Sequence, residues 1–247
     1  MKSIAYPAKQ FKSAFTLVEL LTVIAIIGIL SALLLVVIPH VITAAKIRKA
    51  QMQMGAIATA IQSYETDYGH FPVSHAVQSA ANPDFTYGGQ FKSPTGTISV
   101  GTPISTSIMS NSDVIAVLMN FTNYPGTATP TINLNGQANP KREAYLAANM
   151  PGDTSSPGVG TDLVYRDPWG NPYVISLDLN DDGVCEDNFY KTATVSGGGI
   201  NGLILQPDGN YGFHGKIMVW SAGPDGQIDP NSPANQGGNK DNVLSWR

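Results

Sequence analysis

Residues 15–38 form an almost unbroken apolar segment, and this segment constrains the chain more than any other feature. As an α-helix it would be about 36 Å long, enough to cross a hydrocarbon layer about 30 Å thick. One carboxylate, Glu19, lies near its start. Because a charge inside hydrocarbon is costly, a lone ionisable side chain there indicates a functional role and should have a partner. The apolar residues around Glu19 suggest no partner within the helix.

The residues before the apolar segment are basic. They include Lys2, Lys9 and Lys12 and no acidic residue. This excess of positive charge predicts that the first end of the segment stays in the cytoplasm and that the rest of the chain lies outside. A plain single-pass anchor is one interpretation of the pattern, but it does not account for Glu19 or for the residues around it.

The string Ala14-Phe15-Thr16-Leu17-Val18-Glu19-Leu20 stands between the basic leader and the long apolar helix. It resembles the class III signal of type IV pilins and of type II secretion pseudopilins. The resemblance implies that a membrane prepilin peptidase cuts between Ala14 and Phe15, removes residues 1–14 and methylates the new amine. The usual residue before the cut is glycine, so Ala14 is a departure that keeps a small side chain.

The resemblance also implies a partner for Glu19, the fifth residue after the cut. In assembled filaments of this family, that carboxylate is thought to pair with the N-terminal amine of a neighbouring subunit. An opposite charge nearby offsets the cost of burying a carboxylate. The family often has a proline where this chain has Val36, whereas Pro39 lies three residues later. We expect the helix to bend near Pro39.

Beyond residue 38 the sequence predicts an α+β fold. An amphipathic continuation of the helix over 39–72 should run to about Tyr68 and stop at Gly69. The composition of residues 73–160 predicts a variable, loop-rich insertion. Residues 161–247 are predicted to form a small antiparallel sheet on which the second half of the long helix packs. The expected short elements are helices over 112–119, with Ser112 as N-cap, and over 141–148, and strands over 162–165, 173–177 and 216–221.

Three stretches in the C-terminal third resemble the major, G-type pseudopilin. They are Asp167-Pro168-Trp169-Gly170-Asn171, the stretch 220–226 and the stretch 241–246. The resemblance implies that the first is a tight turn with its indole packed beneath it. It covers residues 9–72 and 161–247 but not the middle of the chain.

Composition limits the functions that the outer part can have. The formal net charge is −4, and loss of the three leader lysines makes it −7 (−4 − 3 = −7), which argues against general nucleic-acid binding. Cys185 is the only cysteine, so no intramolecular disulfide can form. A bound metal could serve as a staple instead.

The first candidate calcium site lies near the C-terminus. The resemblance implies side-chain ligands from Asp225 and Asp241 and main-chain carbonyl ligands from Ala222 and Ile228. Asn242 stands where the family often has a second acid. The further oxygen-bearing residue nearby is Asp229, a substitute ligand. A solvated acidic turn is the alternative interpretation.

The second, weaker candidate is the stretch 178–186. Asp178, Asn180 and Asp182, followed by Gly183, fit the first half of a calcium loop. The twelfth position is Phe189 instead of the usual glutamate, so Glu186 or Asp187 would have to close the site. The alternative is a polar hairpin turn at Asp182-Gly183.

The sequence shows no nucleophile elbow, phosphate-binding loop or metalloprotease motif, so we do not expect an enzyme. The predicted function is structural. The subunit would sit in the bacterial inner membrane with a periplasmic domain, polymerise through its N-terminal helix into a type II secretion pseudopilus, and work with the secretion platform and minor pseudopilins. The alternatives are a type IV pilus or competence-pilus subunit and a single-pass anchored binding domain that does not polymerise.

Overall fold

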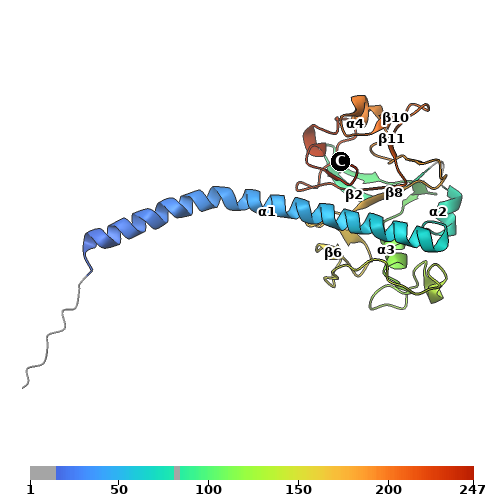
Figure 1. Ribbon diagram of the computed structural model, residues 1–247, viewed down its shortest axis with the longest axis horizontal. Helices are drawn as coiled ribbons and strands as arrows, with labels where there is room; N and C mark the ends of the chain where they lie inside the picture. The colour runs from blue at the N-terminus through green and yellow to red at the C-terminus, as the bar shows by residue number, and fades with distance from the viewer. Residues whose placement is uncertain (1–14, 81–83) are drawn as a thin grey trace, which may run out of the picture. The chain divides into compact units, whose positions relative to one another are not determined.

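The computed structural model describes residues 15–80 and 84–247. The chain divides after Ala44 into two compact units. Figure 1 shows the order of the elements along the chain. The helices are α1 (Leu17–Tyr68), α2 (His75–Ala80), α3 (Ser112–Leu118) and α4 (Ala193–Ser196), with 3-10 turns η1 (Leu134–Gly136), η2 (Gly197–Gly199) and η3 (Gly237–Asn239). The strands are β1 (Phe85–Tyr87), β2 (Gly89–Ser93), β3 (Gly96–Val100), β4 (Pro103–Ile104), β5 (Ser107–Ile108), β6 (Gly158–Val159), β7 (Tyr165–Arg166), β8 (Val174–Leu177), β9 (Val184–Cys185), β10 (Ile204–Leu205), β11 (Tyr211–His214), β12 (Ile217–Ser221) and β13 (Val243–Leu244).

Helix α1 ends where the sequence predicts. Its last residue is Tyr68, and Gly69 follows with a φ of 72° and donates its N–H to the carbonyl of Glu65 (2.7 Å). A left-handed residue that closes a helix in this way is most often glycine. The helix does not stop at Pro39. The predicted bend there stays a prediction.

The first part of α1 presents its apolar side chains to the outside. Phe15 is 74% exposed, and the large apolar side chains described between Leu17 and Ile42 are all exposed as well. Among the described residues, α1 is the one helix long and apolar enough to cross a membrane. An exposed apolar surface of this size indicates a lipid or protein environment.

The central sheet lies in the second unit and is antiparallel, with the strand order β1-β8-β12-β13. Successive side chains of a strand point to opposite faces, and both faces of this sheet are buried. Ile175, Leu177 and Val219 join the apolar cluster that also contains the second half of α1, whereas Met218 and Trp220 join a second cluster. The predicted α+β class, a long N-terminal helix with an antiparallel sheet, is confirmed.

The two clusters differ in composition. The α1 residues Ala50, Met54, Ile57, Ile61 and Tyr64 are all buried, and their spacing forms one face of the helix. The second cluster is built around Trp220, whose indole packs against aromatic rings with centroids 5.1–5.7 Å away. These rings belong to Phe91, Phe189 and Tyr190.

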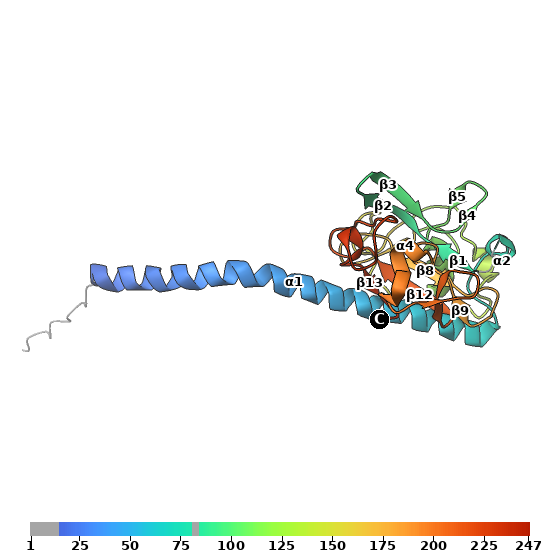
Figure 2. The same cartoon turned by 90° about the horizontal axis from the view of Figure 1, so that it is seen from above.

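The segment 73–160 is more ordered than the predicted loop-rich insertion. It supplies β1, which forms an edge of the central sheet, and α3, whose seven residues are all buried. The hairpin β2–β3 lies on the side of the sheet away from α1 (Figure 2). This part of the chain therefore contributes to the core and does not only connect its parts.

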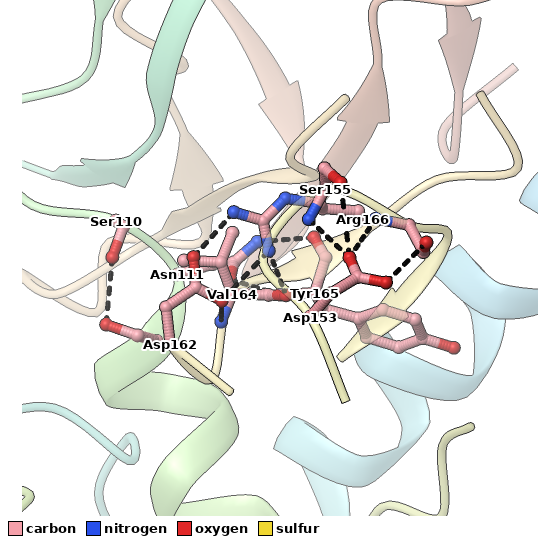
Figure 3. Close-up of polar contacts among 10 residues, drawn as sticks. Ser110, Asn111, Asp153, Ser155, Asp162, Val164, Tyr165 and Arg166 are labelled. Carbon is pink, nitrogen blue, oxygen red and sulfur yellow. Dashed lines mark hydrogen bonds and ion pairs between the residues drawn. The ribbon is translucent and has the colours of Figure 1, made fainter. Parts of the chain in front are cut away.

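Asn111, directly before α3, fastens this helix to the sheet region. Its side-chain amide donates to the carbonyls of Tyr165 (3.0 Å) and Tyr173 (2.8 Å) and accepts from the N–H of Tyr165 (2.9 Å). Figure 3 shows this contact beside the bidentate pair of Arg166 with Asp162. The N-cap of α3 is Asn111, so the prediction of Ser112 was wrong by one residue.

Two predicted elements differ from the structure. The helix expected over 141–148 does not form, because the N–H groups of Tyr145 and Leu146 both donate to the carbonyl of Leu118 at the end of α3. The strand expected over 162–165 begins only at Tyr165. Before it, Leu163 has a φ of 57° and donates its N–H to the Gly160 carbonyl, so this stretch is a turn.

The end of α1 is tied to the segment 138–145. Tyr64 donates its hydroxyl hydrogen to the carbonyl of Ala138, and Tyr68 donates to Asn139 Oδ1 (2.8 Å). The Tyr145 hydroxyl donates to Asp67 (2.6 Å). The tyrosines at the end of the helix thus hold a segment that lies over 70 positions away in the sequence.

Candidate functional site

The first candidate site is the start of α1. Glu19 Oε2 accepts hydrogen bonds from the backbone N–H and the hydroxyl of Thr16, each 2.8 Å long, and the Thr16 hydroxyl accepts from the N–H of Glu19 (3.2 Å). Thr16 immediately precedes the helix, so the two residues form a capping box. Phe15 lies just before them. Ala14, the other predicted processing residue, lies outside the described residues.

This arrangement corrects one expectation. We expected no partner for Glu19 within the helix, but Thr16 fills that role. The signal was present in the sequence, because a threonine followed three residues later by glutamate, ahead of an apolar run, predicts such a cap. The cap satisfies two backbone donors at the start of the helix. It brings no positive charge to the carboxylate.

The second candidate region joins two of the stretches that resemble the G-type pseudopilin. Asp167 is fully buried, and its Oδ1 accepts from the N–H groups of Trp169 (2.8 Å) and Asn171 (2.9 Å). Its Oδ2 accepts from the hydroxyl of Ser221 (2.5 Å) and from the side-chain amide of Asn171. The same amide donates to the carbonyl of Gly223 (3.1 Å). One buried carboxylate thus fixes both turns relative to each other.

The loop that begins at Gly223 carries the first candidate metal ligands. A side chain at Gly223 would place its Cβ only 2.2 Å from the carbonyl oxygen of Asp241, so the two backbone segments approach as only glycine permits. Burial raises the pKa of Asp241, and the nearby charge of Asp225 raises it further. The loops at 222–228 and 241–242 therefore converge, as the predicted site requires.

Unpartnered oxygens identify where a cation would fit. In the described part of the chain, Asp241 Oδ1 and Asn242 Oδ1 are buried and have no hydrogen-bond partner. Such oxygens are costly unless something else satisfies them. The amide of Asn242 donates to the Tyr190 hydroxyl (2.7 Å), which fixes its orientation. The carboxylate oxygen of Asp241 and the amide oxygen of Asn242 are ligand atoms of the kind that a hard cation prefers.

The remaining predicted ligands of this site divide into two groups. Ala222 and Ile228 are buried on either side of Asp225, so their carbonyls lie on the same loop. Asp229 instead accepts hydrogen bonds within its own turn, at Oδ1 from the N–H of Asn231 (2.9 Å) and at Oδ2 from the hydroxyl of Ser232 (2.7 Å). Its oxygens are therefore already engaged.

The second candidate loop, 178–186, is folded around its own carboxylates. Asp178 is buried, and its Oδ2 accepts from the N–H of Gly183 (2.9 Å). Asp182 Oδ1 accepts from the N–H of Val184 (2.9 Å), and its Oδ2 accepts from the amide of Asn180 (2.8 Å). Gly183 has a φ of 83°, but the alternative of a hairpin turn at Asp182-Gly183 was wrong, because β8 pairs with β1 and β12 whereas β9 pairs with β11.

Sequence reasoning missed Asp84, which lies beside this loop. Its Oδ2 accepts from the N–H of Glu186 (2.6 Å). Burial raises the pKa of Asp84 to about 7, and the charges of Asp178, Asp182 and Glu186 add to this effect. Asp84 lies 94 positions before Asp178 in the sequence (178 − 84 = 94), so no local pattern could have revealed it.

Asp187, the alternative closing residue, has a different role. Its Oδ1 accepts from the N–H groups of Phe189 and Tyr190, and its Oδ2 accepts from Ser176 and from the indole of Trp220 (2.9 Å). Both oxygens are thus used to organise the aromatic cluster. Glu186 accepts from the amide of Asn210 (3.0 Å) and stays beside Asp84.

Within residues 15–80 and 84–247, no three His, Cys, Asp or Glu side chains gather as a metal-binding group. Amide and main-chain oxygens are further ligands that calcium accepts, and both loops offer them. Burial raises the pKa of the Cys185 thiol well above its ordinary value, which is typical of an inert structural cysteine.

A family model for the prokaryotic N-terminal methylation motif matches residues 10–35. The matched motif supports a type IV pilin-like protein, and it implies processing by a prepilin peptidase and polymerisation of the chain with itself. The motif and the apolar helix together fit a membrane-anchored, single-pass protein. No curated protein and no solved structure matches the chain.

Proposed function

We propose that this protein is the repeated subunit of a type II secretion pseudopilus. The observation that carries the proposal is the methylation motif at residues 10–35, placed at the start of a helix whose apolar side chains are all exposed where they are described up to Ile42. In the membrane, lipid would cover this surface. In a filament, the same surface would pack against neighbouring helices, so the subunit could leave the bilayer without exposing it to water.

The proposed maturation begins with a cut between Ala14 and Phe15 and methylation of the Phe15 amine. The cut removes residues 1–14 with their three lysines and leaves a new positive charge four residues before Glu19. Thr16 contacts only Oε2 of the Glu19 carboxylate. Oε1 is then the oxygen that we expect to accept the amine of the neighbouring subunit. Such a pair would neutralise both charges inside the apolar filament core.

Two features favour the pseudopilin over a pilus subunit. The chain has one cysteine and so cannot close a C-terminal loop with a disulfide. The turns at 167–171 and 220–226 instead meet through Asp167, beside the unpartnered oxygens of Asp241 and Asn242. We propose that calcium binds there, with Asp225, Asp241 and Asn242 as side-chain ligands and the carbonyls of Ala222 and Ile228, and that it replaces the disulfide as the staple.

The proposed organisation follows from this function. Residues 1–14 are the leader, 15–38 the membrane and assembly segment, and 39–72 the helix that carries the periplasmic domain. The partners would be the inner-membrane secretion platform and minor pseudopilins.

A type IV pilus or competence-pilus subunit is the second candidate, favoured by the same motif. Deleting the gene would abolish export of a secreted enzyme in the first case, and surface filaments or DNA uptake in the second.

A matched pair of variants tests whether the chain polymerises through Glu19. Glu19→Ala removes both the cap and the carboxylate, whereas Thr16→Ala removes the side-chain part of the cap alone. We expect Glu19→Ala to abolish filaments in sheared-cell fractions while Thr16→Ala still forms them, with leader removal verified by mass for each variant. Normal assembly of a processed Glu19→Ala variant would contradict the proposal and favour an anchored domain that does not polymerise.

A further inference from the structure

The loop after β8 has the internal geometry of a calcium loop. Counted from Asp178, position three is Asn180, position five is Asp182 and position six is Gly183. The first carboxylate accepts the N–H of the glycine (2.9 Å), and Gly183 has the positive φ that the sharp turn at this position needs. Strand β9 starts at position seven, Val184, whose carbonyl is the fourth ligand of such loops.

The loop lacks the residue that normally closes the site. Position twelve is Phe189, which is 5% exposed and packs in the aromatic cluster around Trp220. A carboxylate must therefore come from elsewhere in the chain if the loop holds a cation. The nearest acid along the chain, Asp187, is fully buried, and its carboxylate is held in the aromatic cluster by the Trp220 indole, Ser176 and the N–H groups of Phe189 and Tyr190.

Asp84 is placed to supply that carboxylate. Strand β1 pairs antiparallel with β8, and Phe85 lies opposite Leu177. The same register, continued by one residue, places Asp84 opposite Asp178. Two like charges opposite each other destabilise a sheet unless something compensates them. The Glu186 N–H donates to Asp84 Oδ2 (2.6 Å), which fixes the carboxylate at the loop.

The other oxygen of Asp84 has no partner. Asp84 is 7% exposed, and its Oδ1 is a buried acceptor without a hydrogen bond to any described residue. An ionised carboxylate in this position is costly unless a cation or a donor meets it. The neighbouring charged groups of the loop are Asp178, Asp182 and Glu186, all acidic. Of the nearby lysines, Lys216 pairs with Asp181 (2.6 Å) and Glu65 (2.8 Å), and Lys191 lies near Glu186.

We propose that Asp84 closes a calcium site whose other ligands are Asp178, Asn180, Asp182 and the carbonyl of Val184. Two carboxylates from the loop, one from β1, an amide oxygen and a carbonyl would supply the oxygen-rich set that calcium prefers, with water to complete it. Without an ion, the carboxylates among the described residues do not lie together as a metal-binding group, and Asp182 bonds to Asn180 and Val184, so the loop would close on the cation as it binds. Magnesium demands a more regular octahedron and retains its water, so it suits this mixed set less well. The site would fasten the edge strand β1 to the loop between β8 and β9.

This inference does not rest on the proposed filament function, because the site lies wholly within the second unit. Isothermal titration of the full-length chain in detergent, with calcium as the titrant, tests it. Asp84→Asn keeps an acceptor for the Glu186 N–H but places an amide group where the unpartnered oxygen lies. We expect this variant to bind calcium at this site at least about tenfold more weakly.

Asp181→Asn is the matched control. It removes the same charge from the same loop, but Asp181 faces Lys216 and is not a proposed ligand. We expect its calcium affinity to stay within about twofold of the wild type. Equal losses from Asp84→Asn and Asp181→Asn would show a general charge effect and overturn the proposal. Unchanged binding by Asp84→Asn would overturn it as well.

If Asp84→Asn fails to fold, a variant of another proposed ligand, Asp182, tests the same site. Asp182 is exposed, so Asp182→Asn should leave the fold intact, which circular dichroism can verify. We expect it to weaken the same binding event while the C-terminal site, removed separately by Asp241→Asn, stays independent. A folded Asp182→Asn variant with wild-type calcium binding would contradict the inference.

Discussion

Ser221 donates its hydroxyl hydrogen to the buried carboxylate of Asp167 (2.5 Å), and this bond joins two turns that lie 54 positions apart. Asp167 accepts three further hydrogen bonds, from the N–H groups of Trp169 and Asn171 and from the side chain of Asn171. A buried charge is tolerated when it is surrounded by donors in this way.

We predict that Asp167→Asn destabilises the second unit by about 1–3 kcal/mol. The new amide would face the side-chain amide of Asn171, so two donors would meet. Urea unfolding of the full chain, followed by near-ultraviolet circular dichroism, measures the effect. Asp153→Asn, at an exposed carboxylate in a local turn, is the control and should cost less. A midpoint unchanged by Asp167→Asn would contradict the structural role.

Asp113 predicts a specific pH dependence. Burial raises its pKa to about 6, and its Oδ2 has no hydrogen-bond partner among the described residues. Below about pH 4 the carboxyl is protonated in both the folded and unfolded states. Between about pH 4 and about pH 6 the unfolded state ionises this carboxyl while the folded state keeps it protonated, so stability falls over this range and the loss is complete above about pH 6.

Asp113→Asn should therefore gain stability over the wild type on going from about pH 4 to about pH 7, by on the order of 2 kcal/mol. The other buried acids titrate in both proteins, so the difference between their unfolding free energies isolates this carboxyl. A difference that does not change with pH would contradict the assigned burial.

The tie between α1 and the segment 138–145 predicts a change in proteolysis. The Tyr68 hydroxyl donates to Asn139 Oδ1 and accepts the N–H of Lys141 (2.9 Å). Tyr68→Phe removes both bonds and should speed trypsin cleavage after Lys141 and Arg142, because local opening becomes easier. Tyr124→Phe, at a tyrosine that makes none of these contacts, is the control. Equal cleavage rates in the two variants and the wild type would contradict the tie.

These contacts show where sequence reasoning succeeds and where it does not. The end of α1 at Tyr68, the strands β8 and β12 and the turn at Asp167 follow from local patterns, because glycine, alternation and turn residues act within a few positions. The cap of Glu19 by Thr16 was also readable from local spacing.

The contacts of the middle segment were not readable in this way. Asp84 faces the acidic loop only because β1 pairs with β8, a long-range register that no local pattern specifies. The helix expected over 141–148 does not form, because the carbonyl of Leu118 accepts hydrogen bonds from the N–H groups of Tyr145 and Leu146. In both cases tertiary pairing overrides local preference.

The proposed C-terminal calcium site predicts different results for neighbouring acids. Asp241 Oδ1 has no hydrogen-bond partner among the described residues, whereas both oxygens of Asp229 are engaged in a turn. We predict that Asp241→Asn loses one calcium-binding event and that Asp229→Asn keeps it. Combining Asp241→Asn with Asp84→Asn should remove the response of thermal stability to EGTA. Loss of the same event in Asp229→Asn would mean that Asp229 is a ligand after all.

The central claim is that the chain matures as a filament subunit. The most direct measurement is the intact mass and N-terminal sequence of the membrane-extracted protein, with and without an active prepilin peptidase. We predict a chain that begins at Phe15 and is heavier by one methylene group only when the peptidase is present. A chain that still begins at Met1 beside active peptidase would contradict the account and favour an anchored domain that does not polymerise.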